Sequence, residues 1–226
     1  MDKKKVVVDL DGVLFQLTET IVDKLKVEYP NLSMDSIITY DFNKSLLKLP
    51  VEDAVKHLDV EIVEKIVRED FDATLGVPRN ILLEQYSRIE YYKSAPVYED
   101  SCKALIKLFD LGKYNIVFNS SAFGEFSSNI AWNKSLRLKD LFEEYTYGVI
   151  ISENVKKPTI LDADIVIDDC LEVLYDYIKV GSNAKLFLVD QPYNRLAVTK
   201  EDKEVLEKVT RISSIADVEA ILREQV

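Results

Sequence analysis

Two pairs of aspartates stand where chemistry could occur, each at the end of a short apolar run. The first is Asp9 and Asp11, in Val-Val-Val-Asp-Leu-Asp-Gly, and the second is Asp168 and Asp169, in Ile-Val-Ile-Asp-Asp. Two residues apart on a strand, Asp9 and Asp11 are expected to point to the same side. Carboxylates so close together repel unless a cation lies between them or one holds a proton. A strand ending in an Asx-type turn at Gly12 stays open as an ordinary explanation of the first pair, but the repeated arrangement favours a shared cation.

Hydroxyl groups and lysines accompany these aspartates. Ser120 and Ser121 follow the apolar run Ile-Val-Phe-Asn, and hydroxyls at the carboxyl end of a strand can hold a phosphate together with backbone N–H groups. A serine that caps a helix is the more common explanation of such a position. Lys156 and Lys157 precede the second acidic pair and could direct positive charge toward a phosphoryl group, although each alone is typical of a surface residue.

Short apolar runs and helical periods alternate along most of the chain. Runs rich in β-branched residues predict strands over 5–10, 114–119, 147–151, 165–167 and 185–189, with a weaker one over 208–212. Helical spacing of apolar residues predicts helices over 101–111, 126–141, 170–179 and 214–224. This alternation predicts an α/β fold with a doubly wound, Rossmann-like parallel sheet whose strands are buried on both faces. Ligands of such sheets bind at the carboxyl ends of the strands.

One stretch departs from this alternation and contains no convincing central strand. Helix-like segments over 18–29, 50–57, 60–70 and 80–92 dominate it. We therefore expect a small helical cap domain over 18–93, inserted after the first strand of a core domain that comprises 1–17 and 94–226.

Composition excludes several classes of protein. The 226 residues include 29 Lys and Arg against 40 Asp and Glu, a formal net charge of −11, and an acidic surface repels a nucleic-acid polymer. Two cysteines, Cys102 and Cys170, and the single His57 are too few for a disulfide framework or a structural zinc site. No apolar run approaches the ~20 residues that span a bilayer, and Met-Asp-Lys-Lys-Lys runs into a strand rather than a signal peptide. We expect a cytoplasmic protein without a membrane partner.

Four motifs, namely the first aspartate pair, the two serines, the two lysines and the second aspartate pair, occur in this order along the chain. Together they resemble the haloacid dehalogenase superfamily of phosphohydrolases over residues 4–17 and 95–190. This resemblance implies that Asp9 is the nucleophile and forms an aspartyl-phosphate, with Asp11 as general acid and base. It also implies that Ser120, Ser121 and Lys157 bind the phosphoryl group or balance its charge. Asp11 argues for phosphate chemistry, because the dehalogenase branch of the superfamily typically lacks this second aspartate.

The same resemblance implies a Mg²⁺ cofactor. Asp9, the main-chain carbonyl of Asp11 and Asp168 would hold the ion, and Asp169 would act beside it. An oxygen-only ligand set of this kind is the one that Mg²⁺ prefers. Phosphoryl transfer depends mainly on positioning and on relief of charge at the phosphate oxygens, which such a site supplies.

Within the superfamily the chain is similar to the bacterial and phage 5′(3′)-deoxyribonucleotidases. The matching segments are Asp9–Leu14, Thr39-Tyr40-Asp41-Phe42, Ser120-Ser121, Ala131-Trp132, Thr159 with Ala163-Asp164 and Ile167-Asp168-Asp169, and Asp190-Gln191-Pro192-Tyr193-Asn194. This similarity implies hydrolysis of (deoxy)nucleoside monophosphates, with Tyr40 and Phe42 of the cap as substrate-facing residues. The family often has a second lysine three residues before the tryptophan, and here that position is Asn129.

Two other functions stay open. The same catalytic residues could serve a sugar phosphate or another small phosphate ester, or the fold could bind metal or nucleotide without catalysis. The expected partner is a small phosphate ester, and the oligomeric state stays open between a monomer and a homodimer. Trp132 is expected in the core, and Cys170 is expected to pack beneath the site rather than to react.

Overall fold

A computed structural model describes residues 3–27, 30, 32–34, 37, 85–195 and 200–223. Most of the predicted cap lies outside these residues, including the helices expected over 50–57 and 60–70 and the side chains of Tyr40, Phe42 and His57. The cap boundaries therefore remain a prediction. None of the helices formed by the described residues has the length and apolar character needed to cross a bilayer.

The sheet contains six strands in the order β3-β2-β1-β4-β5-β6, and every neighbouring pair is parallel. This arrangement confirms the predicted doubly wound sheet, because the chain proceeds outward from β1 first in one direction and then in the other. Its strands are β1 (Lys4–Val8), β2 (Tyr114–Ala122), β3 (Gly148–Glu153), β4 (Ile165–Asp168), β5 (Lys185–Val189) and β6 (Thr210–Ile212).

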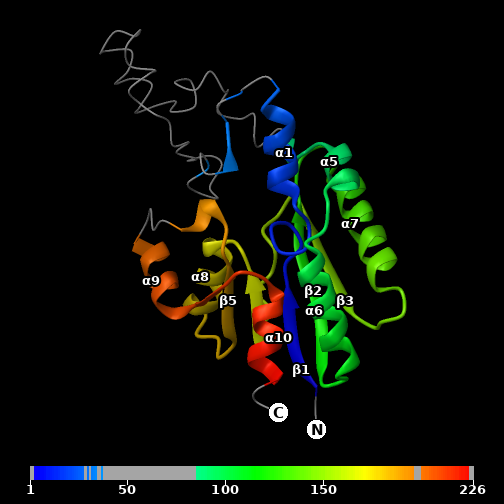
Figure 1. The fold of residues 1–226 in the computed structure, drawn as a ribbon. Coiled ribbons are helices and arrows are strands. Elements are labelled where there is room, and N and C mark those ends of the chain that lie inside the picture. The colour runs from blue at the N-terminus through cyan, green and yellow to red at the C-terminus, as the bar shows by residue number, and fades with distance from the viewer. Residues whose placement is uncertain are drawn as a thin grey trace.

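Helices cover both faces of the sheet (Figure 1). Val6 and Val8 of β1 share one apolar cluster with α6 (Glu99–Asp110), the end of α7 (Ser127–Phe142) and α10 (Ile215–Arg223). Val7 points to the other face, where it belongs to a cluster with α8 (Leu171–Lys179) and Val205 of α9 (Lys200–Lys208). Alternate residues of one strand thus bury themselves against two different helix layers, as a central strand requires.

Two further helices lie beyond the carboxyl ends of the strands. They are α1 (Leu17–Leu25), which follows β1, and α5 (Ile89–Ser94), which leads back into the core domain (Figure 1). Leu17 and Ile21 of α1 form an apolar cluster with Tyr92 of α5 and Ile130 of α7. This packing attaches the two ends of the predicted cap to the edge of the sheet where ligands of the fold bind.

Two expectations about burial are wrong. Trp132 is 64% exposed on the outer side of α7, so it is not a core residue. Strand β3 is not buried on both faces, because Val149 and Ile150 are 40% and 38% exposed. The position of β3 at the end of the strand order explains this exposure, since an edge strand has a neighbour on one side only.

Candidate active site

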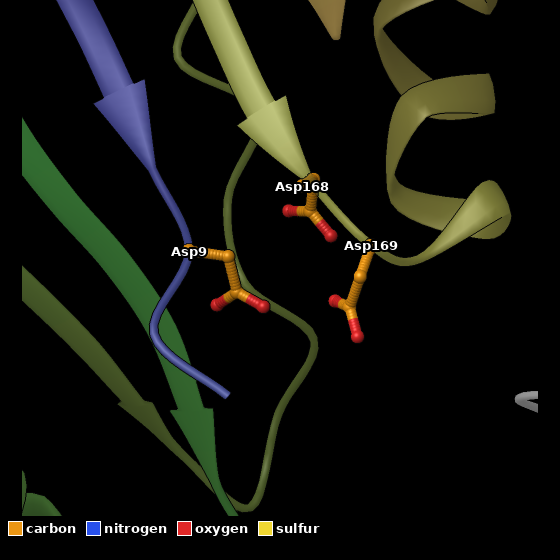
Figure 2. Close-up of side chains that lie close together, drawn as sticks. All are labelled: Asp9, Asp168 and Asp169. Carbon is orange, nitrogen blue, oxygen red and sulfur yellow. The ribbon is translucent and has the colours of Figure 1, made fainter. Parts of the chain in front are cut away.

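Three carboxylates meet where β1 and β4 end. The two strands are adjacent and parallel, with Val8 opposite Ile167, and the Asp9 amide donates to the Ile167 carbonyl at 3.0 Å. Asp168 ends β4 and Asp169 follows it. Figure 2 shows the side chains of Asp9, Asp168 and Asp169 converging from these two strand ends. One oxygen from each carboxylate lies within 4.8 Å of the other two, and all three residues are buried. We call these three residues the acidic cluster.

The sequence suggested that Asp9 and Asp11 lie on the first strand, but the structure places both of them after it. Strand β1 ends at Val8, so Asp9 and Asp11 belong to the loop that follows. Gly12 in this loop has a φ of 75°, a conformation that disfavours residues with a side chain. A Cβ atom at Gly12 would lie 2.0 Å from Oδ2 of Asp169, so the glycine also permits the close approach of the two acidic segments.

Lys157 is the lysine that reaches the acidic cluster. Its Nζ lies 3.0 Å from Oδ1 of Asp9 and 2.7 Å from Oδ2 of Asp168, and its side chain is 8% exposed. The loop that carries it is fixed to β2, because Asn119 Nδ2 donates to the Pro158 carbonyl at 3.0 Å.

Its neighbour Lys156 points elsewhere. Lys156 Nζ forms ion pairs with Glu172 at 2.7 Å and Asp176 at 2.6 Å, both on the surface of α8. The structure therefore separates two adjacent lysines that the sequence could not distinguish.

A second lysine, which the sequence analysis missed, faces the other aspartate of the loop. Lys134 of α7 is 1% exposed and forms an ion pair with Asp11. Its Nζ also donates to Oγ of Ser120 at 3.0 Å and to the carbonyl of Ser121 at 2.6 Å. We call Lys134, Asp11, Ser120 and Ser121 the Lys134 cluster. The ring of Tyr92 lies 5.0 Å below the same ammonium group.

A sequence signal for Lys134 did exist. Ile130, Lys134 and Leu138 are spaced four residues apart and all three are buried, so the lysine lies on the apolar stripe of α7. A lysine in such a stripe carries a charge that needs a buried partner. The resemblance to the deoxyribonucleotidases instead implies a second lysine at the position of Asn129, which lies five residues before Lys134 and on another side of the helix.

Burial and mutual repulsion set the electrostatics of the acidic cluster. Burial, assisted by the charge of Asp9, raises the pKa of Asp168 to about 7 although Lys157 opposes the shift. Burial followed by the charges of Asp9 and Asp168 raises the pKa of Asp169 well above its ordinary value. Burial disfavours the charge of Lys157, but Asp168 and Asp9 together raise the pKa of its ammonium group. One cationic side chain is thus too little for three buried carboxylates.

The donor set fits a divalent cation. Oδ1 of Asp169 is buried and has no hydrogen-bond partner among the described residues, which is costly for a carboxylate oxygen unless an ion binds it. Carboxylate oxygens at this spacing provide the hard oxygen ligands that Mg²⁺ requires.

Asp11 has a different environment from the acidic cluster. Burial raises the pKa of its carboxyl group, whereas the ion pair with Lys134 lowers it, and the net shift is upward. A carboxyl group with a raised pKa holds a proton closer to neutral pH and can donate it.

Cys170 follows Asp169 and is buried. Its backbone amide donates to Oδ1 of Asp168 at 2.9 Å, and burial raises the pKa of its thiol, which keeps the thiol protonated. Cys170 is 6% exposed, as expected of a residue that packs rather than reacts. The cap residues Tyr40 and Phe42 lie outside the described residues, so their position stays a prediction.

This chain is similar to known proteins in its structure, and the comparisons of its sequence found no match. No protein-family model matches the sequence, and no curated protein does. A phosphonoacetaldehyde hydrolase-like protein from Oleispira antarctica superposes with a TM-score of 0.51 at 10% identity, over 99% of this chain and 92% of that chain. A candidate phosphatase from Clostridium difficile gives 0.50 at 17% identity, over 98% of this chain and 99% of that one.

The L-2-haloacid dehalogenase from Xanthobacter autotrophicus gives a TM-score of 0.50 at 12% identity, with both chains covered in full at 100%. TM-scores of 0.50 to 0.51 over nearly the full length of each chain indicate that these three structures share the overall fold of this chain. At such low identities the similarity concerns the fold and not the substrate. The chain therefore has the α/β fold of the haloacid dehalogenase-type hydrolases.

Proposed function

We propose that this protein is a Mg²⁺-dependent phosphomonoesterase that acts through an aspartyl-phosphate on Asp9. The observation that carries the proposal is the juxtaposition of two clusters around one loop. Asp9 belongs to the acidic cluster and contacts Lys157, while Asp11, two residues later, contacts Lys134. In this proposal Asp9 is the nucleophile and Asp11 the proton donor, and each is paired with a buried lysine.

The reaction would proceed in two displacements. In the first, a carboxylate oxygen of Asp9 forms a bond to phosphorus while the bond from phosphorus to the ester oxygen breaks, and Asp11 gives its proton to that oxygen. In the second, Asp11 takes a proton from a water molecule, whose oxygen attacks phosphorus and releases Asp9 and inorganic phosphate. The raised pKa of Asp11 suits a group that must hold a proton before the first step and accept one in the second.

Lysines and hydroxyls would bind the phosphoryl oxygens. Lys157 contacts Asp9 at 3.0 Å and so lies beside the nucleophilic oxygen, where it can offset the charge of an approaching phosphoryl group. Ser120 Oγ is within 3.0 Å of Lys134 Nζ, so one phosphate oxygen can be reached by both groups. Water is restricted around them, since Lys134 and Ser120 are each 1% exposed.

Mg²⁺ would be held by Asp9, Asp168 and the main-chain carbonyl of Asp11. When bound, it would neutralise charge on the nucleophile and the phosphoryl oxygens. We extend this ligand set to Asp169. Its Oδ1 has no other partner among the described residues, whereas Asp168 already accepts from the Cys170 amide and pairs with Lys157.

The substrate class that we propose is a nucleoside monophosphate. Support comes from the similarity to deoxyribonucleotidases at Ser120-Ser121 and at 190–194. The sugar phosphates are the competing class.

The test is a phosphate-release screen in Mg²⁺ and in EDTA. Its substrates are p-nitrophenyl phosphate, 5′- and 3′-nucleoside monophosphates and hexose phosphates. We expect Mg²⁺-dependent release that is fastest from a nucleotide. Preference for a hexose phosphate over every nucleotide would overturn the nucleotide assignment alone. If no ester released phosphate, the proposed enzymatic activity would be wrong, and a binding protein of the same fold would be the alternative.

A further inference from the structure

The turn after β5 places three polar side chains in the interior. It contains Gln191 and the short 3₁₀ helix Pro192–Asn194, and Gln191, Tyr193 and Asn194 are 6%, 1% and 0% exposed. Buried polar groups are costly unless they are hydrogen-bonded. The partners of these three residues lie in the two loops of the active site rather than in the turn alone.

Asp169 is held by this turn at two points. The Tyr193 hydroxyl donates to Oδ2 of the Asp169 carboxylate at 2.5 Å, and Asn194 Nδ2 donates to the Asp169 carbonyl at 2.8 Å. Both the backbone and one carboxylate oxygen are thereby fixed. The other oxygen, Oδ1, is left buried without a partner among the described residues.

The same turn reaches the loop that carries Asp9 and Asp11. Gln191 Nε2 donates to the Gly12 carbonyl at 2.8 Å and to the Tyr98 hydroxyl at 3.1 Å. A Cβ atom on Gly12 would lie 2.6 Å from the Tyr193 hydroxyl, so the loop and the turn are in direct contact. The two segments that carry the acidic cluster are therefore joined through one turn.

Strand β6 supports the turn through hydrogen bonds from Arg211. Arg211 of β6 donates from Nη1 to Oδ1 of Asn194 at 2.8 Å and from Nη2 to the Asn194 carbonyl at 3.0 Å. Asn194 Nδ2 also donates to the carbonyl of Val189, the last residue of β5, at 2.8 Å. Asn194 is thus anchored to the sheet by its own side chain and by Arg211.

We propose that the turn over 191–194 is a clamp that sets the geometry of the metal site, with Tyr193 as the positioning residue for Asp169. The proposal rests on the proposed function, because it assigns the clamp to the Mg²⁺ that this function requires. Tyr193 occupies Oδ2 of Asp169 and leaves the buried Oδ1 without a hydrogen-bond partner among the described residues, so that it can bind an ion. Gln191 holds the Gly12 end of the same site. Hydrogen bonds to metal-ligating carboxylates orient them and typically change metal affinity by 10- to 100-fold.

The test is the Mg²⁺ affinity of Tyr193→Phe, measured by isothermal titration calorimetry on protein freed of metal with EDTA. This substitution keeps the ring and removes only the hydroxyl group. We expect a Kd about 10- to 100-fold higher than in the wild type.

The matched control is Tyr145→Phe, which removes a hydroxyl that donates to Asp110 at 3.1 Å on α6. Its Kd is expected to be unchanged. Thermal melting in EDTA distinguishes the positioning role of Tyr193 from a purely structural one. A purely structural role would lower the melting temperature of Tyr193→Phe and leave its Mg²⁺ affinity unchanged.

Wild-type affinity in a folded Tyr193→Phe protein would overturn the clamp while leaving the proposed function intact. Absence of Mg²⁺ binding by the wild type would overturn both the clamp and the metal-dependent reaction. If Tyr193→Phe does not fold, Gln191→Met tests the same clamp at Gly12, with a weakened Mg²⁺ affinity expected and an unchanged one contradicting the proposal.

Discussion

The acidic cluster and the Lys134 cluster each bury a lysine against aspartate, but their charge balance differs. In the acidic cluster three carboxylates meet beside one ammonium group, that of Lys157, which pairs with Asp9 and Asp168. In the Lys134 cluster one ammonium group faces one carboxylate, and a hydroxyl and a carbonyl complete its hydrogen bonds. The first is short of positive charge and suits a cation. The second is balanced and suits an incoming anion that displaces existing contacts.

The largest effect is expected from Asp9→Asn, which removes the nucleophile from the acidic cluster without changing its size. Turnover of p-nitrophenyl phosphate should fall by about 10⁴-fold or more, as for other nucleophile replacements. Circular dichroism should show an unchanged fold. Asp162→Asn is the matched control, because the Asp162 side chain is 73% exposed and pairs with Lys5, near the opposite end of β1 from Asp9. Near-normal turnover by Asp9→Asn would refute the covalent mechanism.

The next effect distinguishes two adjacent lysines. Lys157→Met leaves Asp9 and Asp168 without their shared cation, so we expect a loss of turnover of about 10²- to 10³-fold. We also expect the free energy of unfolding without Mg²⁺ to fall by about 3 kcal/mol, as is typical of a broken buried pair. Lys156→Met removes exposed pairs and should cost less than about 1 kcal/mol with turnover unchanged. Equal losses in the two variants, by kinetics and urea titration, would contradict the assignment of Lys157.

A smaller effect is expected in the other cluster. Lys134→Met should lower kcat/KM by about 10²-fold, because the phosphate loses a buried cation and Asp11 loses its ion pair. Lys139→Met, on an exposed position of the same helix, is the control and should match the wild type. Retention of full kcat/KM by Lys134→Met would mean that this lysine supports the fold alone.

The smallest effect is a pH dependence that belongs to the acidic cluster. An Asp168 pKa of about 7 lies above the ordinary value of 3.8, so the folded state binds a proton that the unfolded state has released. Without Mg²⁺ this group should lower the free energy of unfolding by about 2 kcal/mol between pH 5 and pH 7, and add little change above that range.

Urea titrations of the wild type and of Asp168→Asn, with and without Mg²⁺, measure this difference. Stabilisation by Mg²⁺ should increase over the same pH range, since the ion binds the deprotonated carboxylates. Parallel pH profiles of the two proteins, or equal stabilisation by Mg²⁺ at pH 5 and pH 7, would contradict the charge deficit.

Much of the sheet could be predicted, because its central strands are short apolar runs with few alternatives. Helix α9 could not, since the buried Val205 stands among mostly charged residues in 200–208 and leaves almost no periodic signal. The edge position of β3 is a property of strand order, and no local pattern records it.

The acidic cluster could be predicted once the parallel sheet was predicted. Aspartates that follow parallel neighbouring strands must meet, and Asp9 and Asp168 do. Lys134 was missed because its partner Asp11 lies 123 residues away and the family pattern placed a lysine elsewhere. The choice between Lys156 and Lys157 depends on the direction of a loop that Asn119 fixes, which only the folded chain reveals.

The central claim is that Asp9 carries the phosphoryl group, and trapping that group tests it most directly. Wild-type protein is mixed with p-nitrophenyl phosphate and Mg²⁺, quenched in acid within one turnover and digested for mass spectrometry. We expect one phosphoryl group on the Asp9 peptide of the wild type and of Asp11→Asn, and none on that of Asp9→Asn. Rapid turnover with no phosphorylated Asp9 at any quench time, or phosphorylation of a different residue, would contradict the account.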